Sequence, residues 1–186
     1  YIGSSEDEEI KTATKVYINL AEPELSSREA GRISDGIGLL RAEFMMAGIG
    51  THPKKMIKDG KKNIFIEELA HGIEQFCASF SPRPVIYRAS DFKTNEYRNL
   101  LGGSDFEPEE PNPMLGYRGA YRYINDPEVF KMELEAIKTV RDKKGFNNLW
   151  LMIPFVRTPK ELELVKELIS SSGLRRSANF KIWMMV

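Results

Sequence analysis

The sequence lacks the features of disulfide-bonded, metal-binding, membrane-spanning and secreted proteins. Its one cysteine, Cys77, cannot form a disulfide within the chain, which fits a reducing compartment. Its two histidines, His52 and His71, have no cysteine or second histidine at the spacing of a metal site. No apolar run approaches the length of a membrane span, and the first residues do not follow the pattern of a secretory signal peptide.

The sequence also lacks an excess of charge of either sign, because 27 Lys and Arg residues balance 27 Asp and Glu residues. A balanced chain has no general attraction to nucleic acids or to anionic membranes. Together these absences predict a soluble, cytoplasmic, globular protein that binds neither. Residues 1–14 are acidic and polar, and we interpret them as a linker.

Short apolar segments alternate with amphipathic ones along the rest of the chain. An apolar stripe at steps of three and four residues predicts a helix over residues 63–80, and cap signals at Asp126 and Thr158 start two more. Residues 48–60 are expected to form a loop. Strands that are parallel neighbours in chain order are predicted at residues 15–20, 36–41, 85–88, 149–155 and 180–186.

Alternating strands and helices are typical of α/β proteins built from parallel β/α units. Five such strands do not close a barrel, since a complete (β/α)₈ barrel needs roughly 250 residues. The pattern therefore allows two folds. One is an open, doubly wound sheet, which the pattern alone slightly favours, and the other is the first part of a TIM-type (β/α)₈ barrel.

Three arginines occupy places where α/β proteins bind ligands. Arg41 and Arg88 each end a predicted strand, and Arg118 lies in a loop between two glycines. Ligands bind at the carboxyl ends of parallel strands, and the planar guanidinium group pairs well with carboxylate or phosphate. The alternative is that Arg41 forms only a surface ion pair with Glu43. The recurrence of the pattern at Arg88 favours a binding site.

Three motifs carry a family resemblance: residues 36–44 (GIGLLRAEF), 88–97 (RASDFKTNEY) and 112–119 (NPMLGYRG). In this order they resemble the C-terminal barrel domain of the phosphoenolpyruvate (PEP)-utilising enzymes, which include pyruvate phosphate dikinase and enzyme I of the sugar phosphotransferase system. Residues 88–97 are most similar to the phosphoenolpyruvate synthases (pyruvate, water dikinases). The resemblance implies that residues 15–186 are the N-terminal part of a PEP/pyruvate-binding TIM-type barrel, and that residues 1–14 link it to a preceding swivelling domain.

By this resemblance, the parent enzyme makes PEP, AMP and phosphate from ATP, pyruvate and water through a phosphohistidine. The resemblance also implies that Arg41 and Arg88 contact the transferred phosphoryl group and the substrate, that Arg118 has a supporting role, and that Glu43 orients Arg41. Such roles are physically reasonable, because phosphoryl transfer depends mainly on positioning and charge neutralisation.

The resemblance implies partners and a cofactor as well. The partners are pyruvate or PEP, the swivelling phosphohistidine domain and the ATP-binding domain, and a homodimer is compatible with the sequence. The cofactor is Mg²⁺, whose ligands in the family follow the position of Val186. The family's phosphohistidine motif is not in this sequence, and Cys77 does not match its cysteine acid. We therefore expect no catalytic residue or metal ligand here, and no dikinase activity from this chain alone.

A second hypothesis comes from another class of protein, namely a non-catalytic α/β domain used for binding or assembly. The sequence that follows Val186 would distinguish the two. A glutamate there, with an asparagine–aspartate motif and a cysteine further on, supports the enzyme, whereas a stop codon supports the binding module. A related member of the PEP-utilising family is a third reading of the same motifs.

Overall fold

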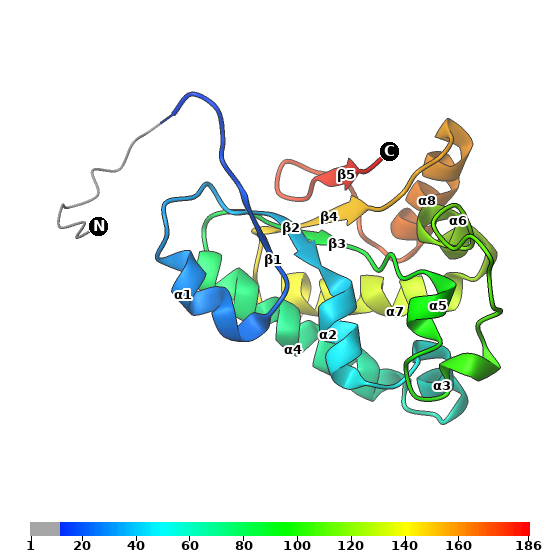
Figure 1. The fold of residues 1–186 in the computed structure, drawn as a ribbon. Helices are drawn as coiled ribbons and strands as arrows, with labels where there is room; N and C mark the ends of the chain where they lie inside the picture. The colour runs from blue at the N-terminus through cyan, green and yellow to red at the C-terminus, as the bar shows by residue number, and fades with distance from the viewer. Residues whose placement is uncertain (1–11) are drawn as a thin grey trace, which may run out of the picture.

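The computed structural model describes residues 12–186, so the predicted linker lies almost wholly outside the described residues (Figure 1). The described chain forms one sheet whose strand order is β1-β2-β3-β4-β5, and every neighbouring pair is parallel. The predicted strand order and direction are therefore confirmed. The strands are β1 (Ile18–Leu20), β2 (Ile37–Arg41), β3 (Val85–Arg88), β4 (Leu149–Ile153) and β5 (Ile182–Met184).

The strand order decides between the two folds that the sequence allows. A doubly wound sheet reverses its strand order at a switch point, whereas the strands of a β/α barrel follow one another in chain order. Strands β1 to β5 show no reversal. The structure is a partial β/α barrel, and the open doubly wound sheet is excluded.

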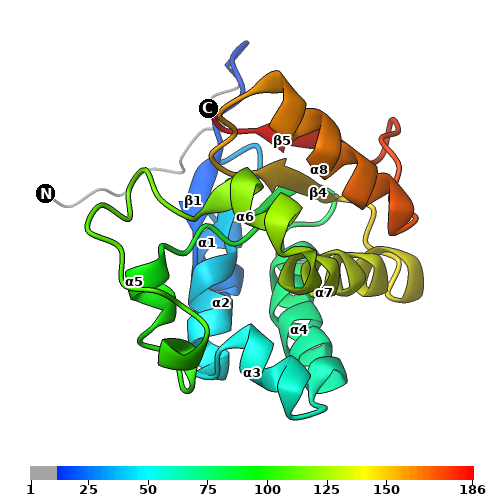
Figure 2. The ribbon, with the colours of Figure 1, turned by 90° about the vertical axis from the view of Figure 1, so that its right-hand side faces the viewer.

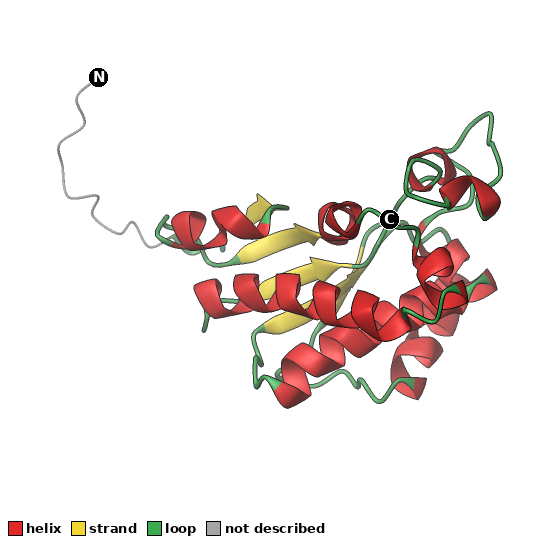
Figure 3. Ribbon diagram, turned by 90° about the horizontal axis from the view of Figure 1, so that it is seen from below, coloured by secondary structure: helices red, strands yellow, loops and turns green. Residues whose placement is uncertain are grey.

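Helices α4 (Lys62–Phe80) and α7 (Pro127–Lys138) pack side by side along one face of this sheet (Figures 1 and 3). The predicted stripe on α4 is confirmed, because Phe65, Leu69, Ile73, Phe76 and Phe80 are all fully buried. No helix in the described residues is long and apolar enough to cross a membrane. The helices are α1 (Ser26–Ala30), α2 (Ala42–Ile49), α3 (Pro53–Lys58), α4 (Lys62–Phe80), α5 (Thr94–Tyr97), α6 (Gly119–Asn125), α7 (Pro127–Lys138) and α8 (Pro159–Ser171).

The expected loop at residues 48–60 is wrong, because it contains α3 and the end of α2. Pro53 occupies the first turn of α3, and the His52 ring accepts a hydrogen bond from the Lys54 N–H at 3.2 Å. Histidine is not a usual cap residue, so no strong start signal precedes this helix in the sequence.

Helices α7 and α8 begin where predicted, at residues Pro127 and Pro159. Thr158 caps α8 by accepting a hydrogen bond from the Glu161 N–H. Asp126 makes no such bond at the start of α7 and pairs with Lys54 instead. Its cap role is therefore a wrong prediction, because the nearby ammonium group of Lys54 engages the Asp126 carboxylate.

The inner face of the sheet is strongly curved. The rings of Tyr17, just before β1, and Trp183, in β5, approach with centroids 6.4 Å apart. These residues belong to the two edges of the sheet, so the contact spans its concave face. Barrel cores are filled in this way, by layers of side chains from alternate strands. The contact therefore supports the partial barrel independently of strand order.

Candidate functional site

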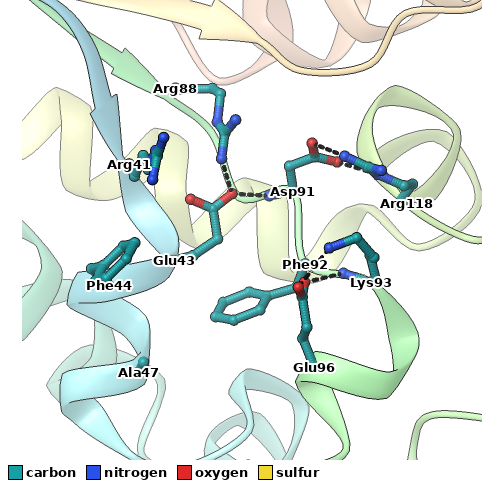
Figure 4. Close-up of a pocket in the computed structure, with 10 residues that line it drawn as sticks. All are labelled: Arg41, Glu43, Phe44, Ala47, Arg88, Asp91, Phe92, Lys93, Glu96 and Arg118. Carbon is teal, nitrogen blue, oxygen red and sulfur yellow. Dashed lines mark hydrogen bonds and ion pairs between the residues drawn. The ribbon is translucent and has the colours of Figure 1, made fainter. Parts of the chain in front are cut away.

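A cavity of about 420 Å³ lies at the carboxyl ends of β2 and β3. Helices α2, α5 and α6 lie around this end of the sheet (Figure 2). The three arginines predicted from the sequence all line this one cavity, together with residues that the sequence did not single out (Figure 4). The lining residues are Arg41, Glu43, Phe44, Ala47, Arg88, Asp91, Phe92, Lys93, Glu96 and Arg118.

Arg41 and Arg88 are brought together by strand register. They are the last residues of β2 and β3, and they pair with each other across the two parallel strands. Both guanidinium groups therefore enter the same space. Figure 4 shows no hydrogen bond or ion pair between Arg41 and the other residues that line the cavity. Arg41 is exposed, so its charge is open to a ligand.

Glu43 pairs with Arg88. This corrects the expectation from the sequence that Glu43 orients Arg41. Its Oε1 atom accepts a hydrogen bond from Arg88 Nη2 at 2.8 Å and another from the Asp91 N–H at 2.6 Å. Glu43 lies in the first turn of α2, immediately after the strand that ends at Arg41. Residues two apart at such a turn do not face each other, so the Glu43 side chain turns towards the neighbouring strand.

Two buried atoms of this pair have no hydrogen-bond partner among the described residues: Glu43 Oε2 and Arg88 Nε. A buried donor or acceptor without a partner costs free energy. Both side chains line the cavity. These two atoms therefore leave unused hydrogen-bonding capacity in the wall of the cavity.

Arg118 is held by a paired set of hydrogen bonds to Asp91. Its Nε atom donates to Oδ1 at 2.9 Å, and its Nη2 atom donates to Oδ2 at 2.5 Å. The hydrogen bonds that Arg118 donates to Asp91 raise the pKa of Arg118 above its ordinary value. Since the Asp91 N–H also donates to Glu43, Arg118, Asp91, Glu43 and Arg88 form one connected chain, with two carboxylates between two guanidinium groups.

The charges around the cavity nearly cancel. Its lining contains four cationic side chains, including Lys93, and three anionic ones, including Glu96, so the net formal charge is +1. Lys93 and Glu96 pair with each other at 2.6 Å. The remaining positive charge is that of Arg41, which has no ion-pair partner among the residues that line the cavity.

Behind the cavity, Glu133 of α7 is fully buried. Its Oε2 atom accepts hydrogen bonds from Tyr87 Oη at 2.8 Å and from the Ser90 N–H at 2.9 Å, and its Oε1 atom accepts one from Ser90 Oγ at 2.6 Å. Burial raises the pKa of Glu133 to about 7, against these bonds. Sequence analysis missed this residue, although it lies three positions after Phe130 and four before Ile137, within an apolar stripe.

Glu133 makes the stability of the fold depend on pH. A carboxyl group whose folded-state pKa is raised adds stability below its ordinary pKa of 4.5, and this contribution is lost as the pH rises through about 7. We expect the wild type to lose about 2 to 3 kcal/mol between pH 5 and pH 8 relative to Glu133→Gln. Urea unfolding of both proteins at the two pH values measures this difference. An equal change in both proteins would contradict the assignment.

A second buried cluster holds the loop that leads to Arg118. The Glu107 carboxylate accepts hydrogen bonds from His52 Nε2 at 3.0 Å and from Arg122 at 2.6 and 2.8 Å. Burial opposes the charge of Glu107, but these bonds outweigh it and lower its pKa. The Arg122 guanidinium also lies over the Tyr97 and Tyr117 rings, 4.9 and 4.5 Å from their centroids. Sequence analysis missed this cluster too.

No group of three or more His, Cys, Asp or Glu side chains in residues 12–186 is placed to hold a metal ion. The carboxylates at the cavity are engaged, since Glu43 and Asp91 pair with arginines and Glu96 pairs with Lys93. What this chain supplies at the cavity is a set of oriented cationic donors.

Comparison with known proteins gives a consistent picture. Residues 6–186 match the family described as PEP-utilising enzyme, PEP-binding domain. The chain is 48% identical to a probable phosphoenolpyruvate synthase of Staphylothermus marinus, over 94% of this chain and 21% of that protein. It is 47% identical to the phosphoenolpyruvate synthase of Aeropyrum pernix, over 94% of this chain and 22% of that protein. For the phosphoenolpyruvate synthase of Neisseria meningitidis the identity is 41%, over 91% of this chain and 24% of that protein. The chain thus spans about a fifth to a quarter of the length of these relatives.

Proposed function

The chain belongs to the PEP-utilising enzyme family, through its PEP-binding domain, and from this premise we propose that its cavity binds the anionic groups of PEP and pyruvate. The observation that carries the proposal is the register pairing of Arg41 with Arg88, which places two guanidinium groups in one cavity. Two such groups at adjacent strand ends suit a ligand that carries both a phosphoryl group and a carboxylate.

The three arginines have different roles in this proposal. Arg41, which has no partner at the cavity wall, meets the incoming anion directly. Arg88 is fixed by the hydrogen bond from its Nη2 atom to Glu43 and lines the cavity beside Arg41. Arg118 is fixed by Asp91 and supports the cavity wall. Cations held in place before the reaction stabilise a transferring phosphoryl group without the cost of reorganisation.

For the whole protein, the family and its relatives support a phosphoenolpyruvate synthase. We propose that it converts ATP, pyruvate and water to PEP, AMP and phosphate, in the cytoplasm and as a homodimer. A phosphohistidine on a swivelling domain, charged at an ATP-binding domain, would deliver the phosphoryl group to this cavity. Mg²⁺ would take its ligands from residues other than 12–186, so this chain alone would bind anions without turnover.

Binding of PEP to the 186-residue chain tests the site. We expect millimolar affinity and selective shifts of the Arg41 and Arg88 Nε–H signals in a heteronuclear NMR titration, because both side chains line the cavity. Arg175, which is exposed and does not line the cavity, provides the internal control. Shifts of similar size at Arg175, or none at Arg41 and Arg88, would contradict the proposal.

A further inference from the structure

The segment that carries Arg88 and Asp91 is held from both sides of the sheet. On the cavity side, Glu43 binds Arg88 and the Asp91 N–H. On the helix side, Ser90 is bound by Glu133 through its N–H and hydroxyl group. The Ser90 carbonyl also accepts a hydrogen bond from the Tyr123 hydroxyl. Ser90 is therefore the point at which buried helical residues fix the cavity wall.

We propose that Glu133 is a positioning residue for the anion site, and that its ionised carboxylate fixes the segment from Arg88 to Asp91 in the geometry that binds the ligand. The inference rests on the proposed function of the cavity. Glu133 does not itself line the cavity, so it acts through the residues that it binds, chiefly Ser90.

The geometry explains why ionisation matters. The two carboxylate oxygens of Glu133 accept three hydrogen bonds, and two of these come from Ser90. A proton on the carboxyl group turns one acceptor into a donor, so at least one of these bonds must be lost or rearranged. The groups that face Glu133 offer few alternative partners for a hydrogen bond that is lost on protonation. They are the hydroxyls of Tyr87, Tyr97 and Tyr123, together with the Glu43 carboxylate, whose charge disfavours ionisation.

Charge and position predict opposite effects of protonation. Protonation removes a negative charge near the arginines, and by charge alone this would strengthen anion binding. If Glu133 acts by position, protonation loosens Ser90 and weakens binding. Because the pKa of Glu133 is raised to about 7, both states can be studied in one protein under mild conditions. The sign of the pH dependence therefore separates the two roles.

Sulfate is a suitable probe, because it is a tetrahedral dianion that does not titrate between pH 6 and pH 8. We expect the wild-type chain to bind sulfate about fivefold more weakly at pH 6 than at pH 8, the effect of losing roughly one hydrogen bond. In Glu133→Gln this dependence should disappear. Glu135→Gln is the matched control, since Glu135 lies on the same helix but is exposed and pairs only with Lys62.

A second variant protects the test against misfolding of Glu133→Gln. Tyr87→Phe removes one donor to the carboxylate, so it should move the midpoint of the pH dependence to higher pH while Glu133 is retained. Stronger binding at pH 6 than at pH 8 in the wild type would overturn the proposal in favour of a charge effect. An unchanged profile in Glu133→Gln, or an unmoved midpoint in Tyr87→Phe, would also overturn it.

The proposed function and this inference can fail separately. If the wild type binds neither PEP nor sulfate at the cavity, the proposed function fails. The backbone amide signals of Ser90 and Asp91 then decide the inference, because they should titrate near pH 7 in the wild type and not in Glu133→Gln. If PEP binds and these signals do not titrate, the inference fails and the proposed function stands.

Discussion

Replacing Arg88 with lysine in the full-length protein is expected to slow phosphoryl transfer to pyruvate by about a hundred- to a thousandfold. Lysine keeps the positive charge and can still pair with Glu43, but it has no counterpart of the Nε–H that Arg88 leaves without a partner beside the cavity. Arg41→Lys should have a similar effect, because lysine lacks the planar set of N–H donors of the guanidinium group. In both variants, phosphorylation of the proposed phosphohistidine by ATP should survive, because in the proposed function the cavity takes no part in that half-reaction.

Separate assays of the two half-reactions measure this effect. Formation of the phosphoenzyme from labelled ATP reports the first, and transfer from the isolated phosphoenzyme to pyruvate reports the second. Arg175→Lys is the control, since Arg175 is exposed and lies away from the cavity. An equal loss in both half-reactions would indicate misfolding, and full transfer activity in Arg88→Lys would remove this arginine from the site.

The second large effect concerns stability. We expect Glu107→Gln to lower the free energy of unfolding by about 3 to 5 kcal/mol, because the change leaves the Arg122 charge buried without its counterion. Arg122 is 7% exposed and Glu107 is 3% exposed, so water does not replace the lost carboxylate. Glutamine preserves the volume, which confines the effect to charge and hydrogen bonding.

Urea unfolding of the chain at pH 7 measures this effect, with Glu109→Gln as the control at an exposed position two residues away. A loss below about 1 kcal/mol, the range of exposed ion pairs, would mean that Arg122 is hydrated in the folded protein. The signals of Tyr117 and Arg118 should also broaden in Glu107→Gln, because the Arg122 side chain donates hydrogen bonds to the Tyr117 carbonyl.

Local patterns in the sequence were sufficient for the framework of the fold. The strands at β3 and β4 are continuous apolar runs whose neighbours in space are also buried, so composition alone located them. The stripe on α4 and the cap at Thr158 depend on residues within one or two turns. Arg41 and Arg88 were found for the same reason, since each is the last residue of a short strand.

Two features of the structure could not be predicted from the sequence: the start of helix α2 and the buried contacts of Glu133. Helix α2 follows Arg41 without a loop, and no side-chain cap bond marks its start, so an apolar run hid the change from strand to helix. Glu133 contacts Tyr87 and Ser90, which lie 46 and 43 positions away. In a sequence, a glutamate on an amphipathic helix is typical of a solvated face. Only the packing of α7 behind β3 gives it buried partners.

The near-cancellation of charge around the cavity has a consequence for how long a ligand stays. With a net formal charge of +1, the cavity becomes net negative as soon as a dianion enters it. The occupied cavity then no longer attracts anions from a distance, and the bound ligand is held mainly by short hydrogen bonds. A product held in this way is released once those few bonds break, and a second anion is repelled from the occupied cavity. The ion pairs that orient the arginines thus also limit residence time, which favours turnover over storage.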